Sequence, residues 1–202
     1  MSRKIIGVDE VGRGCLAGPV VCAAVILPAE HRPWIDQVRD SKKLSAKKRQ
    51  LLSQYITEEC IYSIRDGSPH QIDEINILQA TLWTMRKCVD SVVEQGGRPD
   101  LVLVDGNQEI PKLNLPQQTL KGGDDINKAI GAASIIAKVY RDNYMIGMDP
   151  IFPEYGFAKH KGYGTEQHRE AIMVHGPCRM HRMTFKGVYE YVKGPDSIRD
   201  AT

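Results

Sequence analysis

The chain has 202 residues, of which 42% are hydrophobic and 26% are charged, as in ordinary globular proteins. This length suits one domain with a packed core, which we expect to span residues 1–194 and to precede a loosely ordered polar tail at 195–202. No apolar run approaches the length of a membrane span, and the first residues lead into a predicted strand without a secretory signal, so we expect a cytoplasmic protein without membrane contact.

The cysteines and histidines argue against disulfide and zinc chemistry. The five cysteines are scattered without a C-x-x-C pair, and the six histidines include neither H-x-H nor H-E-x-x-H. We therefore expect reduced thiols and no histidine-based metal site.

Positive charge is concentrated in two segments, although the net charge is only +2. Residues 42–49 hold four lysines and an arginine, and a second group near the C-terminal end includes Lys161, Arg179 and Arg182. Local basic patches on a nearly neutral body suit contact with a phosphate backbone. For either segment, a merely solvated surface is the alternative interpretation.

The first half of the chain reads as two strands, a helix, a strand and a long helix. These elements span residues 4–9, 19–28, 45–59, 60–68 and 72–94. The second half reads as strands at 101–104 and 116–121, a helix at 125–148, a loop at 152–165 and a helix at 165–175. This order predicts an α/β fold, with a mixed central sheet flanked by helices and a C-terminal helical segment.

Two of the predicted strands end in acidic residues. Asp9 and Glu10 close the first strand, Asp105 follows the apolar strand at 101–104, and Asp124 and Asp125 leave a double-glycine loop. Since sites in α/β sheets form at the carboxyl ends of strands, these acids could hold one or two Mg²⁺ ions through oxygen ligands. Neighbours in a regular strand point to opposite faces, so Asp9 and Glu10 would share a site only if the backbone turns at Glu10.

A glycine-flanked arginine follows the first acidic pair. Gly12 and Gly14 lack side chains that would block close approach, so the backbone amides around Arg13 could contact a polyanion. A metal site beside a phosphate-binding loop indicates phosphodiester chemistry. Each motif by itself is also compatible with a solvated turn.

Further short motifs extend this pattern in one order along residues 5–185. The motifs are Asp9-Glu10-Val11-Gly12-Arg13-Gly14, Leu16-Ala17-Gly18-Pro19, Asp40-Ser41-Lys42-Lys43-Leu44, Asn76-Ile77-Leu78, Val104-Asp105-Gly106-Asn107, Lys121-Gly122-Gly123-Asp124, Ala133-Ser134-Ile135-Ile136-Ala137-Lys138 and His160-Lys161-Gly162-Tyr163-Gly164-Thr165. As an ordered set they resemble ribonuclease HII, the type 2 ribonucleases H of bacteria. The resemblance implies a ribonuclease H-like fold.

The resemblance also implies a catalytic, metal-binding set of four carboxylates: Asp9, Glu10, Asp105 and Asp124. Asp125, beside the fourth position, stays an alternative to Asp124. The implied cofactor is Mg²⁺ or Mn²⁺, with two ions able to activate a water and stabilise the leaving 3′-oxygen.

Substrate-binding residues follow from the same resemblance. Gly12, Arg13 and Gly14 correspond to the loop that reads the ribose 2′-hydroxyl, which distinguishes RNA from DNA. Tyr163 corresponds to a residue that stacks on the deoxy sugar at an RNA–DNA junction, although a packed structural tyrosine is the alternative. Lys42, Lys43 and Lys161 are expected to hold phosphates and to add affinity without base specificity.

The implied activity is endonucleolytic cleavage of the RNA strand in RNA–DNA hybrids and 5′ to single ribonucleotides embedded in duplex DNA. Its products carry 5′-phosphate and 3′-hydroxyl ends, and the enzyme is expected to be a monomer. Two rivals stay open: a metal-dependent DNA nuclease or strand transferase on the same fold, and a hybrid-binding module without catalysis. A nucleoside-triphosphate-binding protein is disfavoured because the chain has no G-x-x-x-x-G-K-[ST] loop.

Overall fold

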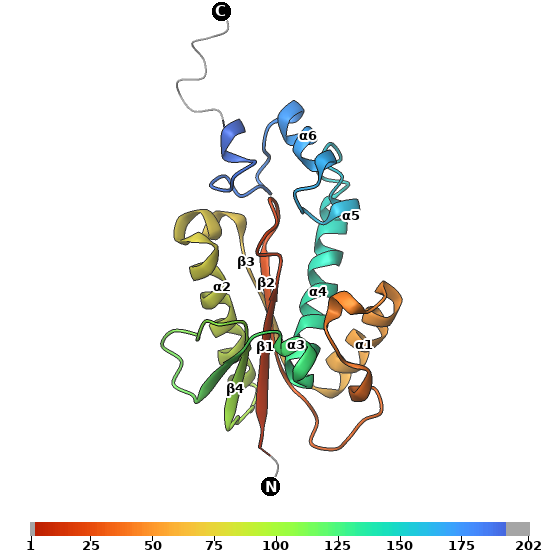
Figure 1. Cartoon of the computed structure of the whole chain (residues 1–202), viewed down its shortest axis with the longest axis vertical. Coiled ribbons are helices and arrows are strands. Elements are labelled where there is room, and N and C mark those ends of the chain that lie inside the picture. The colour runs from red at the N-terminus through yellow and green to blue at the C-terminus, as the bar shows by residue number, and fades with distance from the viewer. Residues whose placement is uncertain (1–2, 193–202) are drawn as a thin grey trace, which may run out of the picture.

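A mixed five-stranded sheet forms the centre of the protein (Figure 1). The structure, a computed structural model, describes residues 3–192, so the expected tail at 195–202 and its boundary lie outside the described residues. The strand order is β3-β2-β1-β4-β5, with β1 antiparallel to β2 and parallel to β4. The strands are β1 (Ile5–Val11), β2 (Val20–Ile26), β3 (Ile61–Gly67), β4 (Leu101–Asp105) and β5 (Gln117–Leu120).

The helices confirm the predicted order of elements. They are α1 (Ala46–Glu59), α2 (Pro69–Glu94), α3 (Gly123–Ile126), α4 (Lys128–Met148), α5 (Phe157–His160) and α6 (Glu166–His175). Between residues 3 and 192 there are also three short 3₁₀ turns: η1 (Ile35–Gln37), η2 (Ser41–Lys43) and η3 (Tyr189–Tyr191).

Apart from shifts of one or two residues at strand ends, the helices differ from the sequence-based expectation in three ways. The second helix starts earlier than predicted, because Ser68 accepts a hydrogen bond from the Gln71 amide and Pro69 suits the first helical turn. The expected helix at 125–148 is two helices, because the extended Asn127 ends α3 and its side chain caps α4. The short α5 lies within the predicted loop at 152–165.

The two faces of the sheet are covered by different helices (Figure 1). On one face, α2 packs its Met85 and Val89 against β1 and β2, while α1 and α4 cover the other face. Every residue of β2 is buried, as expected for a strand covered on both sides. A Cβ atom at Gly7 would lie 2.1 Å from the Ala129 backbone, so α4 rests directly on β1.

The C-terminal segments form a smaller layer at the far end of α4 (Figure 1). There α5, α6 and the chain that follows pack around a core that includes Leu16, Phe157 and Ile172. An isolated bridge between Ala17 and His181 joins this layer to the loop between β1 and β2. Among residues 3–192, no helix combines the length and hydropathy that crossing a membrane requires.

Candidate active site

Asp9 and Glu10 reach a common cavity without a turn in their strand. The turn at Glu10 that a shared site was expected to require is absent, because β1 continues to Val11. The pairing of β1 with β4 ends at Val8 and Val104, so the last part of β1 has no partner on that side. Both side chains line the same cavity at this open edge.

All four expected acids line this cavity, which has a volume of about 460 Å³. Asp9 and Glu10 come from β1, Asp105 ends β4, and Asp124 lies in the first turn of α3. Asp125 instead forms an ion pair with Lys43 on the surface. The tertiary structure therefore places Asp124, and not its neighbour, beside the other three acids.

The double glycine before Asp124 explains this placement. Gly122 adopts a left-handed conformation with φ of 65°, which starts α3 directly after β5. The Gly123 amide then donates a hydrogen bond of 2.7 Å to Asp105 Oδ1. This contact ties the start of α3 to the end of β4 and brings Asp124 to the acids of the sheet.

Burial and mutual repulsion raise the pKa values of three of these acids. Asp9 is only 4% exposed, and burial, followed by the charges of Glu10 and Asp105, raises its pKa well above the usual value. Burial also raises the pKa of Glu10, against the opposing effect of Arg13. The pKa of Asp124 is raised by burial and by the charges of Asp40 and Asp105. In contrast, the hydrogen bond from Lys43 lowers the pKa of Asp125.

The donor set fits a hard divalent cation, although the side chains do not yet converge on one point. Within residues 3–192, no three His, Cys, Asp or Glu side chains already form a group that could hold a metal ion. Asp9 and Asp105 each commit one oxygen to a backbone amide, at 2.7 Å in both cases. Carboxylate oxygens are the ligands that Mg²⁺ and Mn²⁺ prefer, and a cation would relieve the crowding of like charges.

The Gly12–Gly14 turn is buried on one side and open on the other. Gly12 has φ of 90°, and a Cβ atom there would lie 2.2 Å from Arg141 Nε. At Gly14, in contrast, a Cβ atom would meet nothing within 4 Å. The Arg13 side chain is exposed and pairs with Glu10 at 3.5 Å. The turn therefore presents an accessible backbone next to the acids.

Two buried arginines hold this turn from beneath. The guanidinium of Arg182 donates to the carbonyl oxygens of Gly12, at 2.6 Å, and Arg13, at 2.7 Å. Arg141 donates to carbonyls of the same loop and to that of Lys161 at 2.8 Å. Both side chains are 0% exposed. The interpretation of Arg182 as part of a phosphate-binding surface patch is therefore wrong, because its charge faces backbone carbonyls inside the protein.

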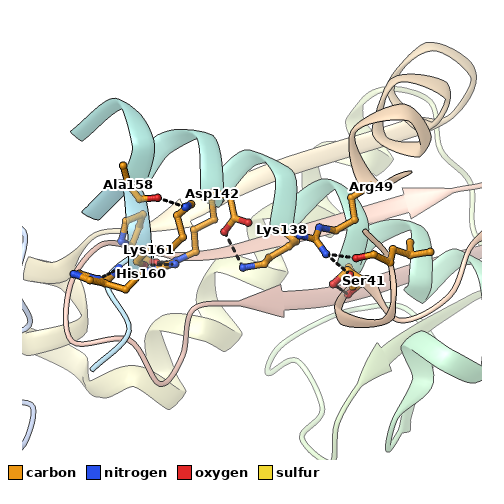
Figure 2. Close-up of polar contacts among 12 residues, drawn as sticks. Ser41, Arg49, Lys138, Asp142, Ala158, His160 and Lys161 are labelled. Atoms are coloured by element: carbon orange, nitrogen blue, oxygen red, sulfur yellow. Dashed lines mark hydrogen bonds and ion pairs between the residues drawn. The ribbon is translucent and has the colours of Figure 1, made fainter. Parts of the chain in front are cut away.

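Tyr163 lines the acidic cavity, and the residue is 39% exposed. The Lys138 ammonium lies 5.7 Å from the ring centroid. Of the three expected phosphate-binding lysines, only Lys42 lines the cavity. Lys43 pairs with Asp125, and the Lys161 ammonium donates to the Ala158 carbonyl (Figure 2).

Ser134 and Lys138 are two cavity residues to which sequence reasoning assigned no role. The Ser134 hydroxyl lies 3.0 Å from that of Ser41, and Lys138 pairs with Asp142 at 2.8 Å (Figure 2). The two residues are one helical turn apart in α4 and so share a face. The four-residue spacing of Ser134 and Lys138 within the Ala133–Lys138 motif could have indicated from the sequence that both side chains face the same site.

A mixed five-stranded sheet with helices on both faces, and with a cavity lined by four acids beside its inner strands β1 and β4, is the arrangement expected of the ribonuclease H-like class. A sequence profile of the family described as Ribonuclease HII matches residues 6–188. The chain belongs to the ribonuclease HII family, which makes it an endoribonuclease of the ribonuclease H type, acting on the RNA of RNA–DNA hybrids.

Individual relatives agree with this assignment. Ribonuclease HII of Syntrophotalea carbinolica is 50% identical over 193 residues, which cover 94% of this chain and 88% of the relative. The RNase HII of Archaeoglobus fulgidus, solved in complex with PCNA, superposes with a TM-score of 0.73 at 27% identity, over 91% of this chain and 95% of that one. Bst RNase HIII, solved in complex with Mn²⁺, shares the fold, with a TM-score of 0.75 at 17% identity over 94% and 69% of the two chains.

Proposed function

We propose that this enzyme cuts 5′ to single ribonucleotides embedded in duplex DNA as well as within longer RNA–DNA hybrids. The products would carry 5′-phosphate and 3′-hydroxyl ends, and a single copy of the chain would suffice. The observation that carries the proposal is the common cavity of Asp9, Glu10, Asp105 and Asp124, which Tyr163 also lines. Phosphodiester hydrolysis and sugar recognition would thus take place side by side.

We propose that the four acids hold two Mg²⁺ or Mn²⁺ ions. A bound divalent cation supplies Lewis-acid activation of a water and neutralises charge on the leaving 3′-oxygen. The protein's own part is to collect the four carboxylates in one cavity. The raised pKa values of Asp9, Glu10 and Asp124 mean that these three carboxylates bind protons more readily than ordinary acids, so metal affinity would fall as the pH is lowered.

We propose that the turn from Gly12 to Gly14 reads the ribose. Among the hydrogen bonds of residues 3–192, none occupies the backbone amides of Arg13 and Gly14. On the opposite side, Arg182 binds the carbonyls of the same turn and holds its peptide planes in place. Amide groups held in this way can approach a 2′-hydroxyl and its flanking phosphate, and the open space at Gly14 leaves room for the sugar.

We propose that Tyr163 reads the next nucleotide by stacking on its deoxyribose. A 2′-hydroxyl at that position would crowd the ring, so the residue would favour a ribonucleotide followed by DNA. Lys42, which lines the cavity, would contact a phosphate there. Lys43 and Lys161 would do the same only after giving up their present contacts with Asp125 and the Ala158 carbonyl.

Cleavage of a DNA duplex that carries one ribonucleotide tests the proposal. The assay is run with Mg²⁺, with Mn²⁺ and with chelator, beside an all-DNA duplex. A metal-dependent cut on the 5′ side of the ribonucleotide, with the control intact, is the expected result. Cleavage of the control would favour the DNA nuclease instead. Cleavage of long hybrids alone would remove the role proposed for Tyr163 and leave the metal site in place.

A further inference from the structure

Three buried histidines lie beneath the loop that carries Tyr163. His160 ends α5, His168 lies in α6, and His181 lies in the segment that follows. They are 8%, 0% and 1% exposed, respectively. The rings of His160 and His168 stack with their centroids 4.3 Å apart, and the Nε2 atoms of His168 and His181 are 3.1 Å apart. Their wide spacing in the sequence gave no sign of this cluster.

Backbone groups at both ends determine where the protons of the His181–His168 pair lie. The Cys178 amide donates to His181 Nδ1 at 2.9 Å, so that nitrogen accepts and Nε2 carries the proton. At the other end the Tyr163 carbonyl can only accept, so His168 Nδ1, at 2.9 Å, carries the proton and donates. His181 Nε2 then donates to His168 Nε2.

The opposite arrangement fails at both ends of this chain of hydrogen bonds. A proton on His181 Nδ1 could reach the Cys178 carbonyl at 3.2 Å, but it would also face the Cys178 amide proton. Reversal would in addition set an unprotonated His168 nitrogen against the Tyr163 carbonyl. Both rings are therefore neutral, and the chain of hydrogen bonds runs in one direction, from Cys178 to Tyr163. We call this chain the histidine relay.

The relay ends on a backbone that is held in an unfavourable conformation. Lys161 has φ of 54° and Gly162 has φ of 83°, so the chain is left-handed at two consecutive residues just before Tyr163. His160 supports the same loop from its other side, since its Nδ1 accepts from the Gly162 amide at 3.2 Å. A loop of this kind keeps one conformation only when its surroundings supply enough contacts to specify it.

We propose that His168 and His181 are positioning residues for recognition of the RNA–DNA junction. By binding the Tyr163 carbonyl, the neutral relay fixes the backbone from which the tyrosine ring enters the acid-lined cavity. This inference rests on the proposed role of Tyr163 as the residue that reads the deoxy sugar. A ring that discriminates a single hydroxyl must be held closely, because displacement by about 1 Å can remove on the order of a hundredfold in rate.

If these positions served packing alone, they would not require the histidine pair His168 and His181. Burial lowers the pKa of both His168 and His181 to about 4, so each ring is kept neutral against its tendency to take up a proton in water. Their neighbours Tyr155 and Phe157 show that this layer accepts aromatic and apolar side chains. The histidines add what those side chains lack, a directed hydrogen bond to Tyr163.

Two variants at one position separate the hydrogen bond from the packing. The amide of an asparagine lies near where histidine carries Nδ1, whereas the amide of a glutamine lies near Nε2. His168→Asn can therefore still donate to the Tyr163 carbonyl, and His168→Gln cannot. The readout is the ratio of kcat/KM on a duplex with one embedded ribonucleotide to kcat/KM on a long RNA–DNA hybrid. We expect His168→Gln to lower this ratio roughly tenfold and His168→Asn to retain most of it.

Matched controls come from the same helix. His175 is an exposed histidine of α6, so His175→Gln should leave the ratio unchanged. Ile172 is 0% exposed, and Ile172→Ala destabilises the layer without removing a contact to Tyr163. If Ile172→Ala lowers the ratio as much as His168→Gln does at a similar loss of stability, the relay has no specific role and the inference is overturned.

A spectroscopic measurement tests the relay without activity. Long-range ¹H–¹⁵N spectra of the histidine rings should show His168 protonated at Nδ1 and His181 at Nε2, with both rings neutral at about pH 6. The reverse tautomers would overturn the inference. Tyr163→Ala separates the two levels of the proposal. If it leaves the substrate ratio unchanged, the role of Tyr163 fails and this inference fails with it; if it abolishes the preference while His168→Gln retains it, only the relay is excluded.

Discussion

The acid-lined cavity and the loops beside it are built in opposite ways. In the cavity, four buried or half-buried carboxylates lie close together, and three of them have raised pKa values. In the neighbouring loops, residues 12–19 and 161–163, many backbone carbonyls accept hydrogen bonds from other backbone groups or from buried side chains. The Gly162 carbonyl, for example, accepts from the amides of Leu16 and Ala17 at 2.8 and 3.3 Å. We call these two loops the recognition platform.

This contrast follows from what each region has to bind. A metal site requires uncompensated negative charge, which destabilises the protein until a cation arrives. A site that reads one hydroxyl requires fixed geometry, which the two buried arginines and the histidine relay supply. Substitutions in the cavity should therefore lower activity while sparing stability, and substitutions beneath the platform should affect stability or selectivity.

The largest expected effect is that of Asp9→Asn. Cleavage should fall on the order of a thousandfold or more, because a ligand worth several kcal/mol is lost. Without divalent metal, the free energy of unfolding should rise by roughly 1 kcal/mol, because a buried charge that repels Glu10 and Asp105 is removed. Asparagine also keeps an oxygen for the Glu10 amide. Urea unfolding in the presence of chelator measures this change in the free energy of unfolding. A clear loss of stability in Asp9→Asn would contradict the view that the cavity acids destabilise the metal-free protein.

Asp124 and Asp125 offer a matched pair for the fourth acid. Asp124→Asn should lower cleavage by about a hundredfold or more, since it removes a carboxylate from the cavity. Asp125→Asn should change cleavage by less than about threefold, since it removes only an exposed ion pair with Lys43. Single-turnover cleavage of a hybrid in Mg²⁺ measures both. Equal losses would mean that both acids serve the metal site.

Substitutions at Gly12 and Gly14 should affect two different properties of the same turn, the stability of the protein and the binding of substrate. Gly12→Ala should destabilise the protein by roughly 2–4 kcal/mol, because φ is 90° and the new Cβ would meet buried Arg141 at 2.2 Å. Gly14→Ala should leave stability within about 0.5 kcal/mol, because the space around it is empty. Its binding to a ribonucleotide-containing duplex should fall about tenfold. Thermal unfolding and fluorescence anisotropy test the pair, and unchanged binding by Gly14→Ala would remove the role proposed for the turn.

Low pH should lower the stability of the protein through the two buried histidines, His168 and His181, that lie beneath the recognition platform. The pKa of His168 and of His181 is about 4 in the folded protein, against about 6.5 when unfolded. Between these values the unfolded chain binds more protons, so stability is full above pH 6.5 and is lost as the pH falls towards 4. Each ring contributes up to roughly 3 kcal/mol, and the acids of the cavity act in the opposite direction.

Urea unfolding between pH 7 and about 4.5 tests this dependence. The decline should be shallower in His168→Asn than in the wild type, because one of the two titrating rings is gone. His175→Gln, on the same helix but exposed, should follow the wild-type curve. A wild-type decline that His168→Asn leaves unchanged would mean that other groups control acid stability.

Lys42 should give the smallest effect. Since its side chain lines the cavity, Lys42→Ala should reduce the slope of log affinity against log salt by about 1 for a hybrid substrate. Lys47, an exposed lysine of α1 outside the cavity lining, provides the control. Equal changes in slope for both variants would indicate a diffuse basic surface rather than one phosphate contact.

The sequence by itself determined the elements and most of the acidic set. Strand and helix patterns are local, and so are caps such as Ser45 and Thr165, whose side chains bind amides within their own first turns. Asp9, Glu10 and Asp105 could be identified because each stands at or near the end of a buried strand, where sites form. The ordered motifs then identified the family.

Only the tertiary structure decided which side chains meet. It placed Asp124 rather than Asp125 in the cavity, and it brought Asp9 and Glu10 to the same cavity from a strand that continues to Val11. It also showed that Arg182, which the sequence placed in a basic surface patch, is buried and donates to the Gly12 carbonyl. Finally, it brought the rings of His168 and His181 into contact. Such contacts depend on the direction in which a residue faces and on partners far away in the chain, and a local pattern of polarity carries neither.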